Sequence, residues 1–308
     1  MIKLTDIKNF NVEKTLGDVL PDIFLLFYND FKKNLIKLRN KYTTDNLHDT
    51  RVAARRMESV FIGYEDVLKT GLRKNSVKEY EKIMKLIKRI IKLFGKPREI
   101  QVLFDIVRNY GKNNRNEKLA AKLFYSDLRI NRVKYIDDLY SSKEFKKSLK
   151  TAEKIPEYVM DFICGNLPSS IFMIPFREHY SQLIKKMKFR LYTDLAGIDL
   201  IDSELLHRIR IETKPLRYLL DMCAGLLDEE FSNFRTLIKV LVEKIGEYHD
   251  VDVVQQKAFS HFINFKKTQS ESANQFVDYL NFLEQEKIKH KVEIISIAKK
   301  LITSNKIG

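Results

Sequence analysis

The residues most able to do chemistry begin with a short basic run near the start of the chain. His48, Arg51 and Arg55 are spaced three and then four residues apart, so a helix would place them on one face, and Arg56 flanks that face. The planar fork of an arginine donates two hydrogen bonds to adjacent oxygens of a phosphate, and a histidine donates to the same kind of oxygen. This run therefore predicts a binding surface for phosphate groups.

A second basic run extends the same pattern further along the chain. His207, Arg210, Lys214 and Arg217 recur at helical spacing and would form a cationic stripe along about three turns. Like charges one turn apart repel and weaken an isolated helix by a few tenths of a kcal/mol, roughly. An anion that neutralises the stripe would remove this cost. We expect the second run to contribute more to binding than the first, because Glu58 interrupts the first.

The two runs belong to a repeat within the sequence. Leu47–Arg55 and Leu206–Lys214 both read LHxxR(V/I)xx(R/K), and a Leu-Ile-Lys triplet precedes Gly95 and Gly246 by the same interval. Two motifs that recur in the same order predict an internal duplication of a four-helix unit.

Further basic residues accompany each repeat. Lys88 and Lys239 end the two Leu-Ile-Lys triplets, two helical turns before the glycine, and we expect them to face the same groove. Arg98 and His249 follow the glycines, where we expect new helices to begin. A helix start has N–H groups that point outward and attract anions, so these two side chains would add donors there.

Acidic residues beside these motifs suggest orientation, not catalysis. Glu99 and Asp250 stand where a carboxylate can cap a helix start or hold an arginine side chain. Metal binding by His48-Asp49 or His249-Asp250 is disfavoured because adjacent residues point to different faces of a helix. We therefore expect no metal site, no cofactor and no catalytic residue. His179, His261 and His290 match no motif and are taken as ordinary residues.

The periodicity of apolar residues predicts an all-α fold. Apolar residues recur at three and four in helices predicted over Leu16–Lys41, Asn46–Lys69, Ser76–Phe94, Asn116–Leu139, Pro175–Tyr192, Ser203–Leu227, Phe231–Ile245 and Ala273–Leu301. Gly246 is among the glycines expected to end helices. Pro156, Pro168 and Pro175 predict the link between two helical halves, 1–160 and 161–308.

Composition limits the possible binding partners and the cellular compartment of the protein. The 308 residues carry a net charge of +15, which favours a negatively charged partner such as nucleic acid, an anionic membrane surface or polyphosphate. Cys164 and Cys223 lie far apart and suit a reducing compartment. No apolar run is long enough for a membrane span, so we expect a cytoplasmic protein.

The motifs together resemble the CHAD domain, the conserved histidine α-helical domain. They are LHDTRVAARRM, LHRIRIETKPLRYLL, FGKPREIQVL and IGEYHDVDVV, and the resemblance covers roughly 15–302. It implies two four-helix bundles related by a pseudo-twofold axis, a basic cavity or groove, binding of inorganic polyphosphate and association with polyphosphate granules. Carried over by motif, the ligand-facing residues are His48, Arg51, Arg55, Arg56, His207, Arg210, Lys214 and Arg217.

The sequence departs from the family pattern at three positions. Glu58 stands where a second basic residue is frequent, Pro215 replaces a basic residue inside the second helix, and Glu99 replaces an aspartate. In many relatives a triphosphate-tunnel domain precedes this one, but its ExExK motif is absent here. The resemblance thus implies a stand-alone, non-catalytic binding module.

Two other functions remain open from the sequence. Nucleic acid offers the same phosphate groups, as a weaker competitor, but basic stripes without interleaved aromatic residues favour a bare phosphate chain. A polyphosphate-processing enzyme would need an acidic metal cluster or a Walker-type loop, and the sequence has no G-x-x-x-x-G-K-[ST].

Overall fold

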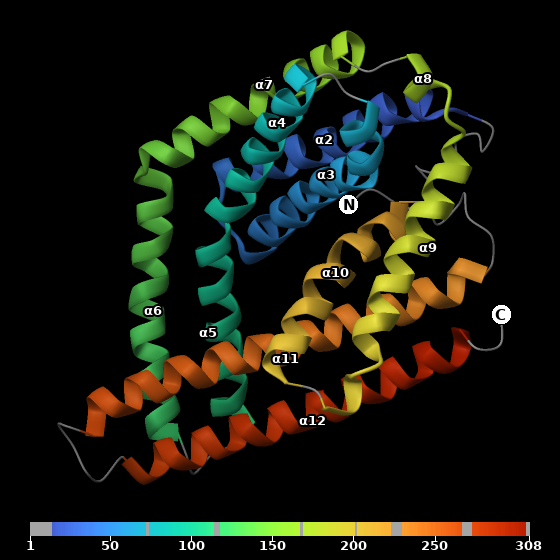
Figure 1. Ribbon diagram of the computed structural model, residues 1–308. Helices are drawn as coiled ribbons and strands as arrows, with labels where there is room; N and C mark the ends of the chain where they lie inside the picture. Colours follow the sequence, from blue (N-terminus) through green and yellow to red (C-terminus); the bar gives the residue numbers. More distant parts are fainter. Residues whose placement is uncertain are drawn as a thin grey trace. The chain divides into compact units, whose positions relative to one another are not determined.

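The computed structural model describes residues 14–71, 74–113, 118–166, 169–200, 202–222, 230–266 and 273–305. These residues are almost entirely helical (Figure 1), and the all-α prediction is confirmed. The helices are α2 (Leu16–Asn40), α3 (Thr44–Gly71), α4 (Lys74–Leu93), α5 (Gly95–Asn113), α6 (Lys118–Ser141), α7 (Lys143–Asn166), α8 (Ser169–Phe172), α9 (Phe176–Leu195), the 3₁₀ turn η1 (Ile198–Leu200), α10 (Ser203–Met222), α11 (Glu230–Lys266) and α12 (Ala273–Asn305). Among the described residues, every helix is too short or too polar to serve as a membrane span.

Side-chain caps fix where the two motif helices begin. Thr43 precedes α3 and Asp202 precedes α10, and each side-chain oxygen accepts the backbone N–H three residues further on, at 3.0 Å and 2.7 Å. His48 and His207 are consequently both the fifth residue of their helices. A shared register relative to the cap is what a duplicated helix predicts.

The chain divides into two compact units. One comprises the described parts of Met1–Phe94, Ser142–Asp194 and Ile211–Lys239, and the other those of Gly95–Ser141, Leu195–Arg210 and Val240–Gly308. Helices α10 and α11 are therefore each divided between the units. The internal duplication and the halves 1–160 and 161–308 stay predictions.

In the first unit, four helices pack in a closed order. Helix α2 contacts α3, α3 contacts α4, α4 contacts α7, and α7 returns to α2. Aromatic side chains fill the space between them, with the Phe61 ring 5.7 Å from that of Phe24 and 6.2 Å from that of Tyr80. On α2, Phe24, Phe27, Tyr28 and Phe31 recur at helical spacing and form one apolar face, and all four are buried.

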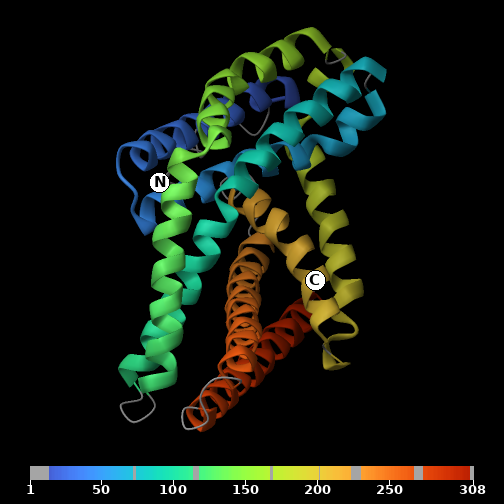
Figure 2. The same ribbon diagram turned by 90° about the vertical axis from the view of Figure 1, so that its left-hand side faces the viewer.

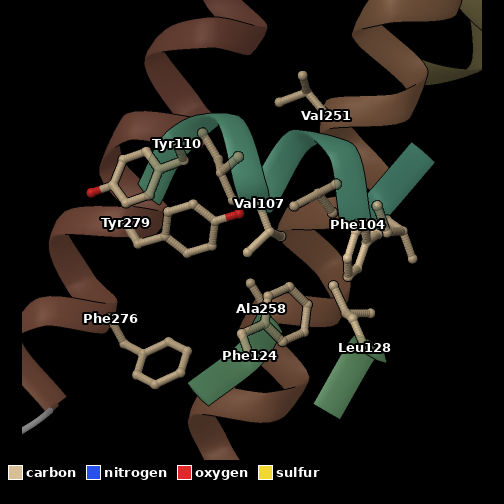
Figure 3. Close-up of a cluster of buried hydrophobic side chains, with 12 residues drawn as sticks. Phe104, Val107, Tyr110, Phe124, Leu128, Val251, Ala258, Phe276 and Tyr279 are labelled. Carbon is tan, nitrogen blue, oxygen red and sulfur yellow. The ribbon is translucent and has the colours of Figure 1, made fainter. Parts of the chain in front are cut away.

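In the second unit, α5 packs along α6, as Figure 2 shows, and α6 contacts α12. Their buried side chains meet those of α11 in one apolar cluster (Figure 3). Ion pairs tie α11 to α12 in antiparallel order, with Lys244 Nζ 3.0 Å from Glu293 and Asp252 2.8 Å from Lys287 Nζ. These ion pairs hold α11 against α12 and so fix the surroundings of the polar residues on two faces of α11.

Two predicted helix breaks are wrong. Gly246 lies inside α11, and Pro156 lies inside α7. A glycine without a neighbouring proline weakens a helix by only about 1 kcal/mol, which burial of the flanking residues outweighs. A new helix does begin at Gly95, and Pro97 falls in its first turn, where a missing N–H costs no intrahelical hydrogen bond.

Candidate functional site

A pocket of about 340 Å³ in the second unit gathers three of the predicted ligand residues, His207, Arg210 and His249. It lies between the start of α10 and the middle of α11. Its lining is Ser203, Glu204, Leu206, His207, Arg210, Ile245, Tyr248, His249 and Asp252. We call it the basic pocket.

Helical spacing explains why these residues share one cavity. Ser203, Leu206, His207 and Arg210 recur every three or four residues on α10, and the lining residues of α11 recur in the same way. Each helix therefore presents one face to the pocket. The helical spacing of His207 and Arg210 in the sequence therefore places both residues in the lining of this pocket.

The electrostatics of the basic pocket favour an anion. The half-buried guanidinium of Arg210 carries a permanent charge, and two histidines supply donors beside it. Ser203 and Glu204 are the first residues of α10, where backbone N–H groups have no intrahelical partner and the helix dipole is positive. The pocket thus combines side-chain and backbone donors.

The two carboxylates in the lining are met by cations. Glu204 lies 3.2 Å from Arg208, and Asp252 lies 2.8 Å from Lys287 Nζ. Burial lowers the pKa of Lys287, but the hydrogen bond to Asp252 and the electrostatic effects of Asp252, Tyr248 and Glu284 together outweigh burial and leave the pKa above the ordinary value. Lys287 therefore stays charged, and neither carboxylate adds an unbalanced negative charge.

Sequence reasoning missed Lys287 and Lys291 of α12. Each ammonium lies 5.8 Å from the centroid of the Tyr248 ring, so both stand next to the basic pocket. Burial raises the pKa of Tyr248, which keeps the phenol neutral. The two lysines are one turn apart in the sequence, but nothing in the sequence says that α12 packs against this part of α11.

The place of His249 differs from the prediction. It was expected beside the start of its own helix, but α11 runs through Gly246 without a break. The helix start near His249 is that of α10, because Ser203 and Glu204 line the same pocket. The predicted combination of histidine and helix start is present, but the helix start belongs to another element.

The first basic run lies on α3 in the first unit, and acids meet part of its charge. Arg55 lies 2.7 Å from Glu58, and Arg56 lies 3.4 Å from Asp30. Both carboxylates are buried, at 7% and 8% exposure. His48 is exposed and Arg51 half-buried on the same helix.

The remaining predicted residues lie outside the basic pocket. In the first unit, Lys88 and Lys239 are exposed, Lys214 is half-buried, and Arg217 Nε lies 3.9 Å from Asp221. In the second unit, Arg98 lines a different pocket. That all twelve residues face one ligand stays a prediction.

Two acidic features of the second unit bear on the predicted roles. Glu99 was expected to hold an arginine, but its oxygen accepts a hydrogen bond from Lys257 Nζ at 2.6 Å.

A cluster of possible metal ligands lies elsewhere in the second unit. The ligand atoms, within 4.8 Å of one another, belong to Glu247, His290 and Glu293. Lys244 Nζ already lies 2.8 Å and 3.0 Å from the two carboxylates, so a cation is built into this cluster.

Comparisons of this chain with family models and with solved structures agree with one another. A family model described as the CHAD domain matches residues 22–258. The CHAD domain crystal structure from the plant Ricinus communis has 16% identity and a TM-score of 0.66, covering 95% of this chain and 93% of that chain. PptA from Streptomyces chartreusis has 11% identity and a TM-score of 0.67, covering 93% and 99%. No curated protein matches the chain. The structural likenesses, at these identities, show the fold.

Proposed function

Since this chain belongs to the CHAD-domain family, we propose that it binds inorganic polyphosphate without transforming it. The observation that carries the proposal is the basic pocket, in which His207, Arg210 and His249 converge on the start of α10. The same proposal places the protein in the cytoplasm, at polyphosphate granules.

The donors of the basic pocket suit a chain of linked phosphates. Arg210 can donate to two oxygens at once, and the first turn of α10 adds backbone donors to the same anion. Lys291 adds a positive charge along α12, and Lys287 balances the charge of Asp252. A long polyphosphate offers many such contacts simultaneously, so it should bind far more tightly than orthophosphate.

The aromatic content of the pocket disfavours nucleic acid. Tyr248 is the aromatic residue in its lining, but it is only 6% exposed. Its ring lies beside the ammonium groups of Lys287 and Lys291, and proteins that bind single strands need exposed rings for base stacking. A bare phosphate chain fits this pocket better than a nucleic acid does.

The acids of the pocket support a non-catalytic role. Asp252 and Glu204 are each paired with a basic side chain, so neither is placed as a general base or as one of several metal ligands. We expect no release of phosphate from polyphosphate when magnesium is supplied.

Titration of the full chain with phosphate chains of different length tests the proposal. We expect tight binding of long polyphosphate, weaker binding of short chains and little binding of orthophosphate. DNA should compete poorly against long polyphosphate. Equal affinity for orthophosphate and polyphosphate, or displacement of polyphosphate by an equal charge of DNA, would overturn the proposal.

A pair of arginine variants locates the binding site. Arg210→Ala should weaken polyphosphate binding by about tenfold or more, because it removes a charge-assisted contact. Arg129→Ala removes the same charge from an exposed position on α6 and should have little effect. Adding Arg51→Ala to Arg210→Ala should remove most of the binding at unchanged helicity. Equal effects of Arg129→Ala and Arg210→Ala would show that only net charge matters.

A further inference from the structure

A second pocket, of about 450 Å³, lies in the second unit between α5, α11 and α12. Successive residues of a helix turn by about 100°, which places Glu247, Asp250 and Val251 of this pocket on the face of α11 opposite Tyr248 and Asp252 of the basic pocket. Phosphate binding in the basic pocket does not account for it.

The charge of this second pocket is opposite to that of the chain. Carboxylates of Asp105, Glu247, Asp250 and Glu286 line it, against the single guanidinium of Arg98. Asp105 accepts hydrogen bonds at 3.0 Å from the neutral amide of Gln101.

Glu286 has one cationic neighbour among the described residues, Lys289, at 3.8 Å. Lys244 already meets the charge of Glu247 at 2.8 Å, so Asp105, which accepts from a neutral amide, and Glu286, with its distant lysine, are the acids suited to a cation.

Apolar side chains form much of the remaining wall. Val102, Ile106, Leu283 and the rings of Tyr110 and Phe282 line the pocket, and the two ring centroids are 4.7 Å apart. Aromatic faces attract ammonium groups, and aliphatic walls bind hydrocarbon. A hydrated metal ion would gain nothing from these walls, whereas an organic cation would use both the walls and the carboxylates.

A buried histidine marks the polar end of the pocket. His290 is 9% exposed, and its Nδ1 is buried and makes no hydrogen bond within the described part of the chain. The carboxylate oxygens of Glu247 and Glu293 lie 3.4 Å and 3.5 Å from Nδ1, outside hydrogen-bonding geometry. In the tautomer without a proton on Nδ1, this buried atom is an acceptor beside two carboxylates, and a ligand N–H that donates to it relieves their repulsion. Glu247 also accepts from Lys244 Nζ at 2.8 Å, so an ammonium group is already a partner of this cluster.

We propose that the second pocket binds a primary ammonium group carried on a short apolar chain. The carboxylates of Asp105 and Glu286 neutralise the ammonium, and the aliphatic and aromatic walls cover the chain. Two sources offer this chemistry, namely free diamines or polyamines and the lysine side chain of another protein.

Calorimetric titration of the full chain tests the proposal. Cadaverine and spermidine serve as free amines, a blocked lysine amide as the side-chain source, and 1-pentanol as a neutral analogue of similar shape. We expect at least one amine to bind at one site per chain and 1-pentanol not to bind. Tighter binding of blocked lysine than of cadaverine assigns a protein partner, and the reverse assigns a free amine. Binding of Zn²⁺ or Mg²⁺ without binding of any amine would overturn the proposal.

Matched variants assign the binding to this pocket. Asp105→Asn with Glu286→Gln removes two charges at nearly constant volume and should weaken amine binding by about tenfold or more. Glu243→Gln with Asp278→Asn makes the same charge change at exposed positions of α11 and α12 and should leave it unchanged. Circular dichroism checks that both variants fold, and retained polyphosphate binding separates this pocket from the basic one. Equal weakening in both double variants would overturn the assignment.

Discussion

At the scale of single residues, the two basic runs differ in how their charges are met. Arg55 and Arg56 each contact a buried carboxylate, so part of the first run serves to balance internal acids. Arg210 lines a pocket whose carboxylates have other cations as partners. Arginines of the two motifs thus serve different surroundings, buried acids in the first unit and a pocket in the second.

A substitution at Glu58 tests this difference. Glu58→Gln keeps the size of the side chain but removes the charge that pairs with Arg55 at 2.7 Å. We expect a loss of about 1 kcal/mol in the free energy of unfolding, kept small because Arg55 is 37% exposed. Polyphosphate affinity should rise, because Arg55 becomes available to phosphate.

Urea denaturation and polyphosphate titration measure the two effects. Glu79→Gln is the control, because Glu79 pairs with Lys82 at 3.5 Å on the surface and should change neither quantity. Unchanged stability together with weaker polyphosphate binding in Glu58→Gln would contradict the interpretation.

The ion pairs of Lys244 give a dependence of stability on pH. The hydrogen bond from Lys244 lowers the pKa of Glu293 from its ordinary value of 4.5. Between the lowered value and 4.5 the unfolded chain binds more protons than the folded one, so stability falls as the pH falls through this window. Lys244→Met removes the cause of the shift.

We expect the wild-type protein to be more stable than Lys244→Met above pH 4.5 and the difference to shrink below it. Urea unfolding at a series of pH values from about 3 to 6 measures the difference. A difference that stays constant across this range would show that the pair does not titrate as described.

At the scale of elements, the two copies of the repeat diverge after the glycine. Gly95 begins α5, with Pro97 in its first turn, whereas Gly246 lies inside α11. The continuous α11 places His249 and Asp252 on one face and Glu247 and Asp250 on the other. The basic pocket and the second pocket both depend on this continuity.

Two glycine substitutions test the helix interiors. A Cβ at Gly246 would meet nothing within 4 Å, so Gly246→Ala should raise the free energy of unfolding by about 0.5–1 kcal/mol through helix propensity. A Cβ at Gly63 in α3 would lie 2.9 Å from Tyr180 Oη and from a methyl carbon of Leu219. Gly63→Ala should therefore destabilise by about 1–3 kcal/mol.

Chemical denaturation of both variants separates propensity from packing. Stabilisation by Gly63→Ala would mean that α3 and α9 are less tightly packed than described. Destabilisation by Gly246→Ala would mean that α11 is not a regular helix at this point.

At the scale of the whole molecule, the net charge of +15 governs encounters with polyanions. It attracts any polyanion, so it cannot by itself distinguish polyphosphate from nucleic acid. Discrimination has to come from the local arrangement of donors, as in the basic pocket. The acidic second pocket shows that local charge can also oppose the net charge.

Salt dependence separates these contributions. Polyphosphate binding should weaken by roughly tenfold to a hundredfold between about 50 and 200 mM salt, because bound counterions are released. In Arg210→Ala the slope of log affinity against log salt should be smaller by about one unit, since one phosphate contact is lost. Fluorescence titration at several salt concentrations gives both slopes, and an unchanged slope would remove Arg210 from the contact.

The sequence by itself determined the helical fold and the residues that share a helix face. Periodicity of apolar residues and the capping residues Thr43 and Asp202 are local, so the bounds of α3 and the register of His207 and Arg210 follow from them. The pair Arg55 and Glu58 is also local, because its members are one turn apart.

Only the tertiary structure decided which faces meet. His249 lies beside the start of α10, Arg56 contacts Asp30, and Lys287 contacts Asp252, all between residues distant in sequence. Such pairs depend on how helices pack, which burial over many residues determines and no local pattern encodes. The wrong break at Gly246 has the same cause, because packing outweighs the small helix-breaking tendency of one glycine.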